Sequence, residues 1–232
     1  MSRFGFWHGG NRPQIEFLGY VLQNNGGASF SSKIFSGVPF GDPASDREIF
    51  LAITHGSPGS QTVTSVTIGG VTASLGTGAG GASVGKSIRS AWASVPSGTT
   101  GNVAITFSGN VPTVMIGVYR VVGRPVVGAS HVDFDSTLAA SGASSATVSG
   151  INIPSAGFSI GCLAIYQNSA SAPSLSGSPF ISDAVVNVQS SGAPIYHAVT
   201  HCPVQDIAIT GASVSWSWGS NKAMVAGVWT FA

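Results

Sequence analysis

The strongest match to a chemistry-bearing pattern in this chain runs from Gly80 to Ser87. These eight residues fit the phosphate-binding loop G-x-x-x-x-G-K-[ST] at every fixed position. In such a loop, backbone amides at a helix N-terminus hold the phosphates, while the lysine and the hydroxyl reach the γ-phosphate and Mg²⁺. The loop needs a strand before it and a helix after it. The segment after Ser87 is short and ends at Pro96, so we expect no such helix and predict no nucleotide site.

A second catalytic pattern overlaps the first. Gly81 to Gly85 fits G-x-S-x-G, the elbow that presents a nucleophilic serine, and this elbow also needs a strand-to-helix turn. Five histidines and eight acidic residues could supply partners for a serine, but a catalytic triad is defined by geometry and no spacing here places one. We therefore expect no enzymatic activity and no cofactor.

Histidines and acids also recur at strand spacing. His131, Asp133 and Asp135 alternate along the chain, and His197 and His201 share the same parity. In a strand, each set would lie on one face, and imidazole and carboxylate groups suit a metal ion. Polar residues at period two are equally typical of the solvated face of a half-buried strand. We expect solvated faces and no metal site.

Two aromatic features are candidate contact sites. Trp216 and Trp218 flank one serine, so a strand would place both indoles on the same face. That face could bind a glycan, but paired tryptophans at period two more often belong to the core or to a subunit contact. Residues 1 to 13 are rich in glycine and carry Phe4, Phe6 and Trp7. We predict that they form an extended N-terminal arm whose aromatic side chains contact a neighbouring subunit, with a frayed terminus as the alternative.

The composition is unusually poor in charge. Only 7% of the 232 residues are charged, against about a quarter in an ordinary soluble protein, while 43% are hydrophobic and 32 are glycine. High apolar content with a net charge of +1 excludes the composition of a disordered chain. So little charge gives no attraction to nucleic acid or to an anionic membrane, and little repulsion between copies. We expect self-association.

Targeting signals and cysteines give weaker constraints. No apolar run approaches the roughly 18 residues of a membrane span, and the N-terminal residues lack the apolar core of a secretory signal. We therefore expect neither membrane insertion nor export. Cys162 and Cys202 are the only cysteines, which leaves either one disulfide or two buried thiols.

The residues that must position any site are predicted to lie on strands. Helix formers are scarce, and Val, Ile, Thr, Phe and Trp recur in short runs at period two between Gly, Pro and Ser turns. We predict an all-β chain, an antiparallel β-sandwich of jelly-roll-like type over residues 14 to 232. The expected strands cover residues 14–23, 29–35, 48–55, 62–68, 71–75, 87–95, 103–108, 113–122, 147–153, 158–167, 184–188, 195–202, 207–209 and 223–231.

A weak internal sequence similarity suggests two halves within this sandwich. The runs at 103–106 and 114–119 resemble those at 207–210 and 223–229 in their apolar alternation. Two pseudo-repeated halves, about 35–123 and 157–232, would explain the echo, and so would the common pattern of buried strands. We favour one sandwich over two domains.

The strand and turn segments of the first half resemble a known family. They are similar, in the same order, to segments of β-sandwich structural proteins of tailed bacteriophages and prophages, and the segments that carry this resemblance are 35–41, 46–53, 63–73, 95–109 and 116–121. The resemblance covers about residues 35 to 123 and is looser toward the C-terminus. In that family, the segment with the phosphate-loop match is a variable loop.

The resemblance implies a non-enzymatic part of the virion, such as a tail, fibre, collar or head-decoration subunit. Its partners would be other copies of itself and other virion proteins, and it would be assembled in the bacterial host cytoplasm. No catalytic residue is carried over. A glycan-binding adhesin or receptor-binding module on the virion surface, with a host-surface glycan as its ligand, is the alternative.

Overall fold

The structure, a computed structural model, describes residues 12–24, 28–56, 59–124, 130–166, 171–190 and 193–232, and these residues form strands and turns without any helix. This confirms the prediction of an all-β chain. The fifteen strands are β1 (Gln14–Asn24), β2 (Phe30–Pro39), β3 (Glu48–Gly56), β4 (Val63–Ile68), β5 (Val71–Thr72), β6 (Ser74–Gly81), β7 (Lys86–Ser94), β8 (Thr100–Val111), β9 (Thr113–Val122), β10 (Asp133–Ile153), β11 (Phe158–Tyr166), β12 (Ser174–Ser176), β13 (Ile181–Ser190), β14 (Ala193–Cys202) and β15 (Ile209–Phe231).

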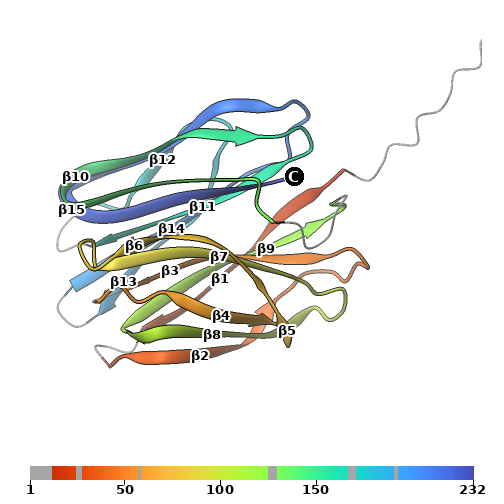
Figure 1. Cartoon of the computed structure of the whole chain (residues 1–232), viewed down its shortest axis with the longest axis horizontal. Helices are drawn as coiled ribbons and strands as arrows, with labels where there is room; N and C mark the ends of the chain where they lie inside the picture. The colour runs from red at the N-terminus through yellow and green to blue at the C-terminus, as the bar shows by residue number, and fades with distance from the viewer. Residues whose placement is uncertain (1–11, 25–27, 57–58, 125–129, 167–170, 191–192) are drawn as a thin grey trace, which may run out of the picture.

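The strands form three antiparallel sheets, stacked as layers in Figure 1. The central sheet has the order β1-β9-β3-β7-β6. The lower sheet, β2-β8-β4-β5, covers one of its faces, and the upper sheet, β10-β15-β11-β14-β13 with β12 added on β15, covers the other. Strands before residue 123 pair only with one another, and so do strands after residue 132, within the described residues. The preference for one sandwich over two domains stays a prediction.

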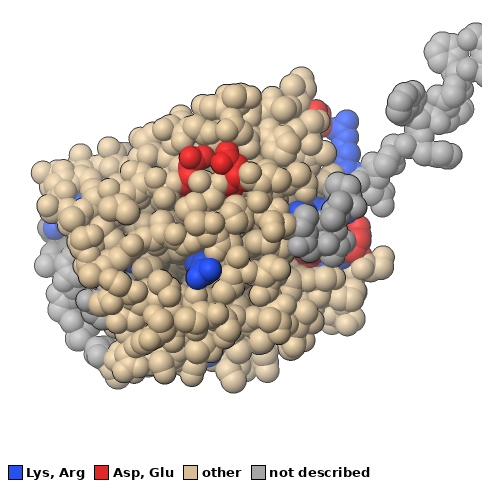
Figure 2. Space-filling view, in the orientation of Figure 1, with Lys and Arg blue, Asp and Glu red and all other residues tan. Residues whose placement is uncertain are grey.

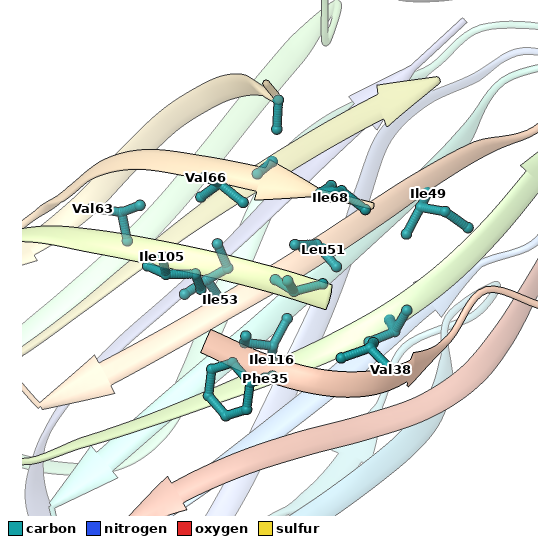
Figure 3. Packing of buried hydrophobic residues seen from close by; sticks show 14 of the residues in the cluster. Phe35, Val38, Ile49, Leu51, Ile53, Val63, Val66, Ile68, Ile105 and Ile116 are labelled. Atoms are coloured by element: carbon teal, nitrogen blue, oxygen red, sulfur yellow. The ribbon is translucent and has the colours of Figure 1, made fainter. Parts of the chain in front are cut away.

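Strand β3 shows why the layers stack. Its Ile49, Leu51 and Ile53 pack against the lower sheet, and Figure 3 shows these side chains among those of β4 and β8. The alternate residues Phe50 and Ala52 pack against the upper sheet. A strand covered on both faces needs an unbroken apolar run rather than an alternating one, and β3 has such a run.

The upper sheet is folded on itself. Strands β10 and β15 are 21 and 23 residues long. The last part of β15, residues 224–231, pairs with β11, whereas residues 215–217 pair with β12 and with the distal part of β10. Side chains of the two parts of β15 meet in a third apolar cluster, so the upper sheet supplies two layers of the stack.

Most strands lie close to their predicted positions, and the differences occur in segments rich in small residues. No strand was predicted for residues 133–146 and 210–222, which belong to β10 and β15, nor for most of β6 and for β12. These segments are rich in small residues, which have low strand propensity. In the structure they form strands because they pair with a neighbouring strand. The jelly-roll topology stays a prediction. So does the arm, because residues 1–11 lie outside the described part.

Arg47 ties the start of β3 to the loops around it. The residue is fully buried, and its guanidinium donates to the carbonyl oxygens of Val95 (2.6 Å), Gly41 (2.8 Å), Ser97 (2.7 Å) and Gly98 (2.8 Å). Five fixed donors on a planar group suit this convergence of carbonyls. The turn before β3 and the loop after β7 are thereby held in one arrangement.

Replacing Arg47 by methionine should lower the free energy of unfolding by about 3 kcal/mol, since four carbonyl oxygens, one buried and three partly buried, would lose their donor. Arg12 is the matched control, because its ion pair with Asp206 is exposed and Arg12→Met should change stability by less than about 1 kcal/mol. Urea denaturation of both variants provides the measurement. Equal losses of stability would contradict the role of Arg47.

Candidate functional site

The segment with the phosphate-loop match forms a β-hairpin. Strands β6 and β7 pair directly, with Gly81 opposite Lys86, and the turn between them is closed by hydrogen bonds from the amides of Val84 and Gly85 to the carbonyl oxygen of Gly81. A strand, not a helix, follows Ser87. The amides therefore do not converge on a phosphate, and neither the nucleotide loop nor the serine elbow is formed.

The side chain of Lys86 is not available to a phosphate group at this turn. Its side chain is buried between the central and upper sheets, where its Nζ donates to the carbonyl oxygen of Val84 at 3.0 Å. Burial lowers the pKa of Lys86 to about 7. The same interface buries His197, whose Nδ1 lies 2.5 Å from the Thr54 hydroxyl, and burial together with nearby His55 and Lys86 lowers the pKa of His197 to about 3.

The predicted histidine and aspartate faces carry no metal-like cluster. His197 and His201 both lie toward the central sheet, but His201 bonds Asp183, whose carboxylate also accepts the Tyr119 hydroxyl at 2.8 Å. His131 bonds a threonine, and Asp133 accepts from backbone amides. Within the described residues, no group of three metal-binding side chains converges. Cys162 and Cys202 are buried and free, on opposite faces of the upper sheet.

The aromatic candidates require a correction. Trp216 and Trp218 do share a face, but this face is the inner one of the folded upper sheet, and only 1% and 4% of the two residues are exposed. Rings this deeply buried cannot stack on a sugar or contact another subunit. Both tryptophans lie on the long β15 and point toward its inner face. The predicted strand over residues 223–231 did not include them. Phe4, Phe6 and Trp7 lie outside the described residues, and their contact role stays a prediction.

A cavity lined by both polar and apolar groups lies at the edge of the central sheet, on the side of the lower sheet. This edge cavity has a volume of about 300 Å³ and is lined chiefly by the ends of β3 and β4 and by the β6–β7 hairpin. Strand pairing places His55 of β3 beside Ser87 of β7, and Ser87 beside Gly80 of β6. Paired residues in an antiparallel sheet share a face. An imidazole, a hydroxyl and a bare glycine thus follow one another toward the sheet edge.

Glycine is required at this edge. A Cβ atom on Gly80 would lie 2.2 Å from the carbonyl oxygen of Lys86, and the φ of Gly80 is +128°. Across the strand pair, Gly78 lies opposite Arg89. A Cβ atom on Gly78 would lie 3.0 Å from the carbonyl oxygen of Ile88, so both glycines allow β6 to approach β7 closely. The sequence analysis considered this glycine-rich segment only as a phosphate-loop match, which it rejected, and it did not single out His55 or Arg89, which come from outside the motif.

Two side chains of the edge cavity keep unused capacity for hydrogen bonds. The Nδ1 of His55 lies 3.0 Å from the Gly56 carbonyl oxygen and so carries the proton, while its Nε2 has no partner. Burial lowers the pKa of His55 to about 4, which makes this ring neutral at pH 7. Arg89 donates to the carbonyl oxygens of Gly76 and Val63, and no carboxylate within the described ranges pairs with it.

Comparison with known proteins adds no assignment: neither protein-family models nor curated proteins yield a match to this sequence. In the part of the chain that the structure describes, no helix is long and apolar enough to cross a membrane.

The buried amine of Lys86 gives a testable pH dependence. An unfolded lysine titrates near 10.5, so between pH 7 and 8.5 the unfolded chain binds more protons than the folded chain, and the free energy of unfolding should rise with pH. The expected rise is up to about 1 kcal/mol per pH unit. Lys86→Met should abolish this rise and increase stability at pH 7.

Lys33 provides the control, because it is only half-buried. The free energy of unfolding of Lys33→Met should still rise with pH, whereas that of Lys86→Met should not. Urea denaturation at pH 7.0, 7.75 and 8.5 provides the measurement. The two buried thiols oppose this rise only slightly, because burial raises their pKa and an unfolded thiol, which titrates near 9, is still mostly protonated below pH 8.5. Their effect is the same in the unmodified chain and in both variants. A flat profile in the unmodified chain would contradict the buried, neutral state of Lys86.

Proposed function

We propose that the chain is a non-enzymatic structural subunit of a tailed-phage virion, which acts by assembling with copies of itself and with other virion proteins. The virion assignment is supported by the resemblance of residues 35–123 to that class of proteins. Those residues supply β3 to β9, which make up most of the central and lower sheets. A tail, fibre, collar or head-decoration position is compatible with this proposal.

The observation that carries the assembly proposal is the outer face of the lower sheet. Strand pairing places Ile34, Ala104 and Thr67 side by side there, opposite the face that packs on the central sheet. Ile34 is 61% exposed and Val71 is 43% exposed, and both line a hollow of about 650 Å³. None of the residues around this hollow is charged. Exposed aliphatic side chains around an uncharged hollow are typical of a contact surface.

The low net charge favours a second copy of the same chain as the partner that covers this outer face. The net charge is only +1, so two copies repel each other weakly. Figure 2 shows how sparse the charged side chains are on one side of the molecule. An uncharged face can meet itself across a two-fold axis without placing like charges in contact. Burial of Ile34 and Val71 would then contribute directly to association.

Charging this face should prevent association. We expect the unmodified chain to form oligomers in sedimentation equilibrium and Ile34→Asp/Val71→Asp to weaken the association constant by about 100-fold or more, because a desolvated carboxylate opposes burial. Ile207→Asp is the matched control, since Ile207 is 79% exposed and lies on the upper half of the molecule. A monomeric unmodified chain, or equal weakening by Ile207→Asp, would refute the role of this face.

Virion localisation has its own direct test. Antibodies against the purified chain should label particles isolated from the source culture in immunogold electron microscopy, at repeated, symmetric positions on the tail, fibre, collar or head. Particles that remain unlabelled while the same antibodies detect free chain in the lysate would contradict a virion role.

A further inference from the structure

Strand β1 forms one edge of the central sheet and, within the described residues, pairs only with β9. Its outward backbone groups can be identified, because bonded and non-bonded residue pairs alternate along antiparallel strands. The amide of Val95 donates to the opposite carbonyl oxygen of Arg47 at 3.1 Å, which makes this pair a bonded one. Continued across β7, β3 and β9, the alternation directs the backbone groups of Val21 toward β9 and those of Tyr20 and Leu22 outward.

The second half of β1 lacks the features that keep exposed strand edges apart. Proteins protect such edges with lysine, proline or bulges. The register of β1 shifts once, between Phe17 and Gly19, and from Gly19 to Asn24 the strand pairs regularly and contains neither a charged residue nor a proline. Edge strand β2, by contrast, contains Lys33 and Pro39 and two register shifts. The second half of β1 is therefore open to another strand.

Exposed apolar side chains lie on the same side of the molecule. Strand β13 is an edge strand of the upper sheet and lies beside β1, and Leu22 and Val186 of the two strands pack against one apolar cluster. Tyr20 of β1 and Ile181 of β13 are nearly half exposed, and Val185 of β13 is exposed as well. Large side chains gathered along two sheet edges are typical of a surface that an assembly covers.

The charges on these two edge strands favour a second copy of the chain as the partner. Each strand holds one charged residue, Glu16 in β1 and Asp183 in β13. Glu16 pairs with Arg120, whereas Asp183 accepts hydrogen bonds from His201 and Tyr119. Both carboxylates are thus engaged within the chain, so two copies can approach by this side without strong repulsion.

We propose that this side binds a second copy, with β1 of the two copies paired as antiparallel strands, so that the central sheet continues from one copy into the next. A two-fold axis at Val21 places Tyr20 of one copy opposite Leu22 of the other, where their outward amides and carbonyl oxygens exchange hydrogen bonds. Glu16 then lies far from its counterpart. Two different self-contacts, at β1 and at the lower sheet, join copies into assemblies larger than a dimer.

The β1 contact is weak by itself. So short a strand pair buries less surface than a stable dimer needs, and it forms chiefly at the high local concentration inside an assembly. Its role therefore rests on the proposed assembly function, whereas its existence can be tested separately. Ile34→Asp/Val71→Asp removes the contact of the lower sheet and leaves the β1 contact to be observed alone.

NMR spectroscopy of Ile34→Asp/Val71→Asp tests the pairing. Amide chemical shifts of residues 19–24 should change between about 0.1 and 1 mM, the range in which so small a contact associates. Tyr20→Pro in this background should abolish the change, because it removes an outward donor and breaks no hydrogen bond to β9. Tyr20→Thr is the matched control, since it removes the ring, keeps the amide and should retain the change.

Amide hydrogen exchange in Ile34→Asp/Val71→Asp gives a second measurement that needs no proline. The amides of Tyr20 and Leu22 should exchange about twofold more slowly at the higher concentration, while that of Val21, which is bonded to β9, should not change. Concentration-independent shifts and exchange in β1, a change that persists in Tyr20→Pro, or one that vanishes in Tyr20→Thr would each overturn the proposal. None of these results would bear on the contact of the lower sheet, which is tested by comparing the unmodified chain with Ile34→Asp/Val71→Asp.

Discussion

Burial of the central sheet on both faces is the constraint on which the other features depend. Each strand in the middle of this sheet must carry apolar side chains on both faces, as β3 does with Ile53 on one face and Ala52 on the other. Where the sequence places a polar residue in these strands, it is buried as well. Thr54 and His55 follow directly after the apolar run, on opposite faces, and each must find partners within the protein or remain without one. The histidine acceptor of the edge cavity is therefore a by-product of the three-layer stack.

The central and upper sheets are also joined by polar contacts that fix their relative position. Arg124, which follows β9, forms a fully buried ion pair of 2.9 Å with Glu48 of the neighbouring β3, so this pair lies within the central sheet. The same guanidinium reaches the upper sheet, because its Nε donates to the Ala232 carbonyl oxygen at 3.1 Å and it lies over the rings of Phe158 and Phe231. The ion pair fixes the position of the guanidinium, and the guanidinium in turn contacts the upper sheet. The hydrogen bond between Tyr119 and Asp183 ties a second point of the same interface.

Local features could be predicted from the sequence, and features that depend on stacking could not. The apolar run of β3 and the shared face of Trp216 and Trp218 follow from residue type and period two. That the shared face of the tryptophans is covered depends on the fold of the upper sheet, which brings residues 214–218 over β11. The edge cavity was unpredictable for a similar reason, because only the pairing of β3, β7 and β6 brings His55 and Arg89 to the same cavity. Sequence period reports which residues share a face, but not what lies opposite.

Strands β10 and β15 pass through both layers of the upper sheet without interruption. A load applied to the outer layer is therefore transmitted along covalent chain into the inner layer, where β15 is hydrogen-bonded to β11 along its last eight residues. Force along these strands acts on many hydrogen bonds in shear at once, instead of opening them one after another. The upper half of the molecule should behave as a stiff element that transmits tension, while the lower sheet, which pairs through shorter strands, should yield first.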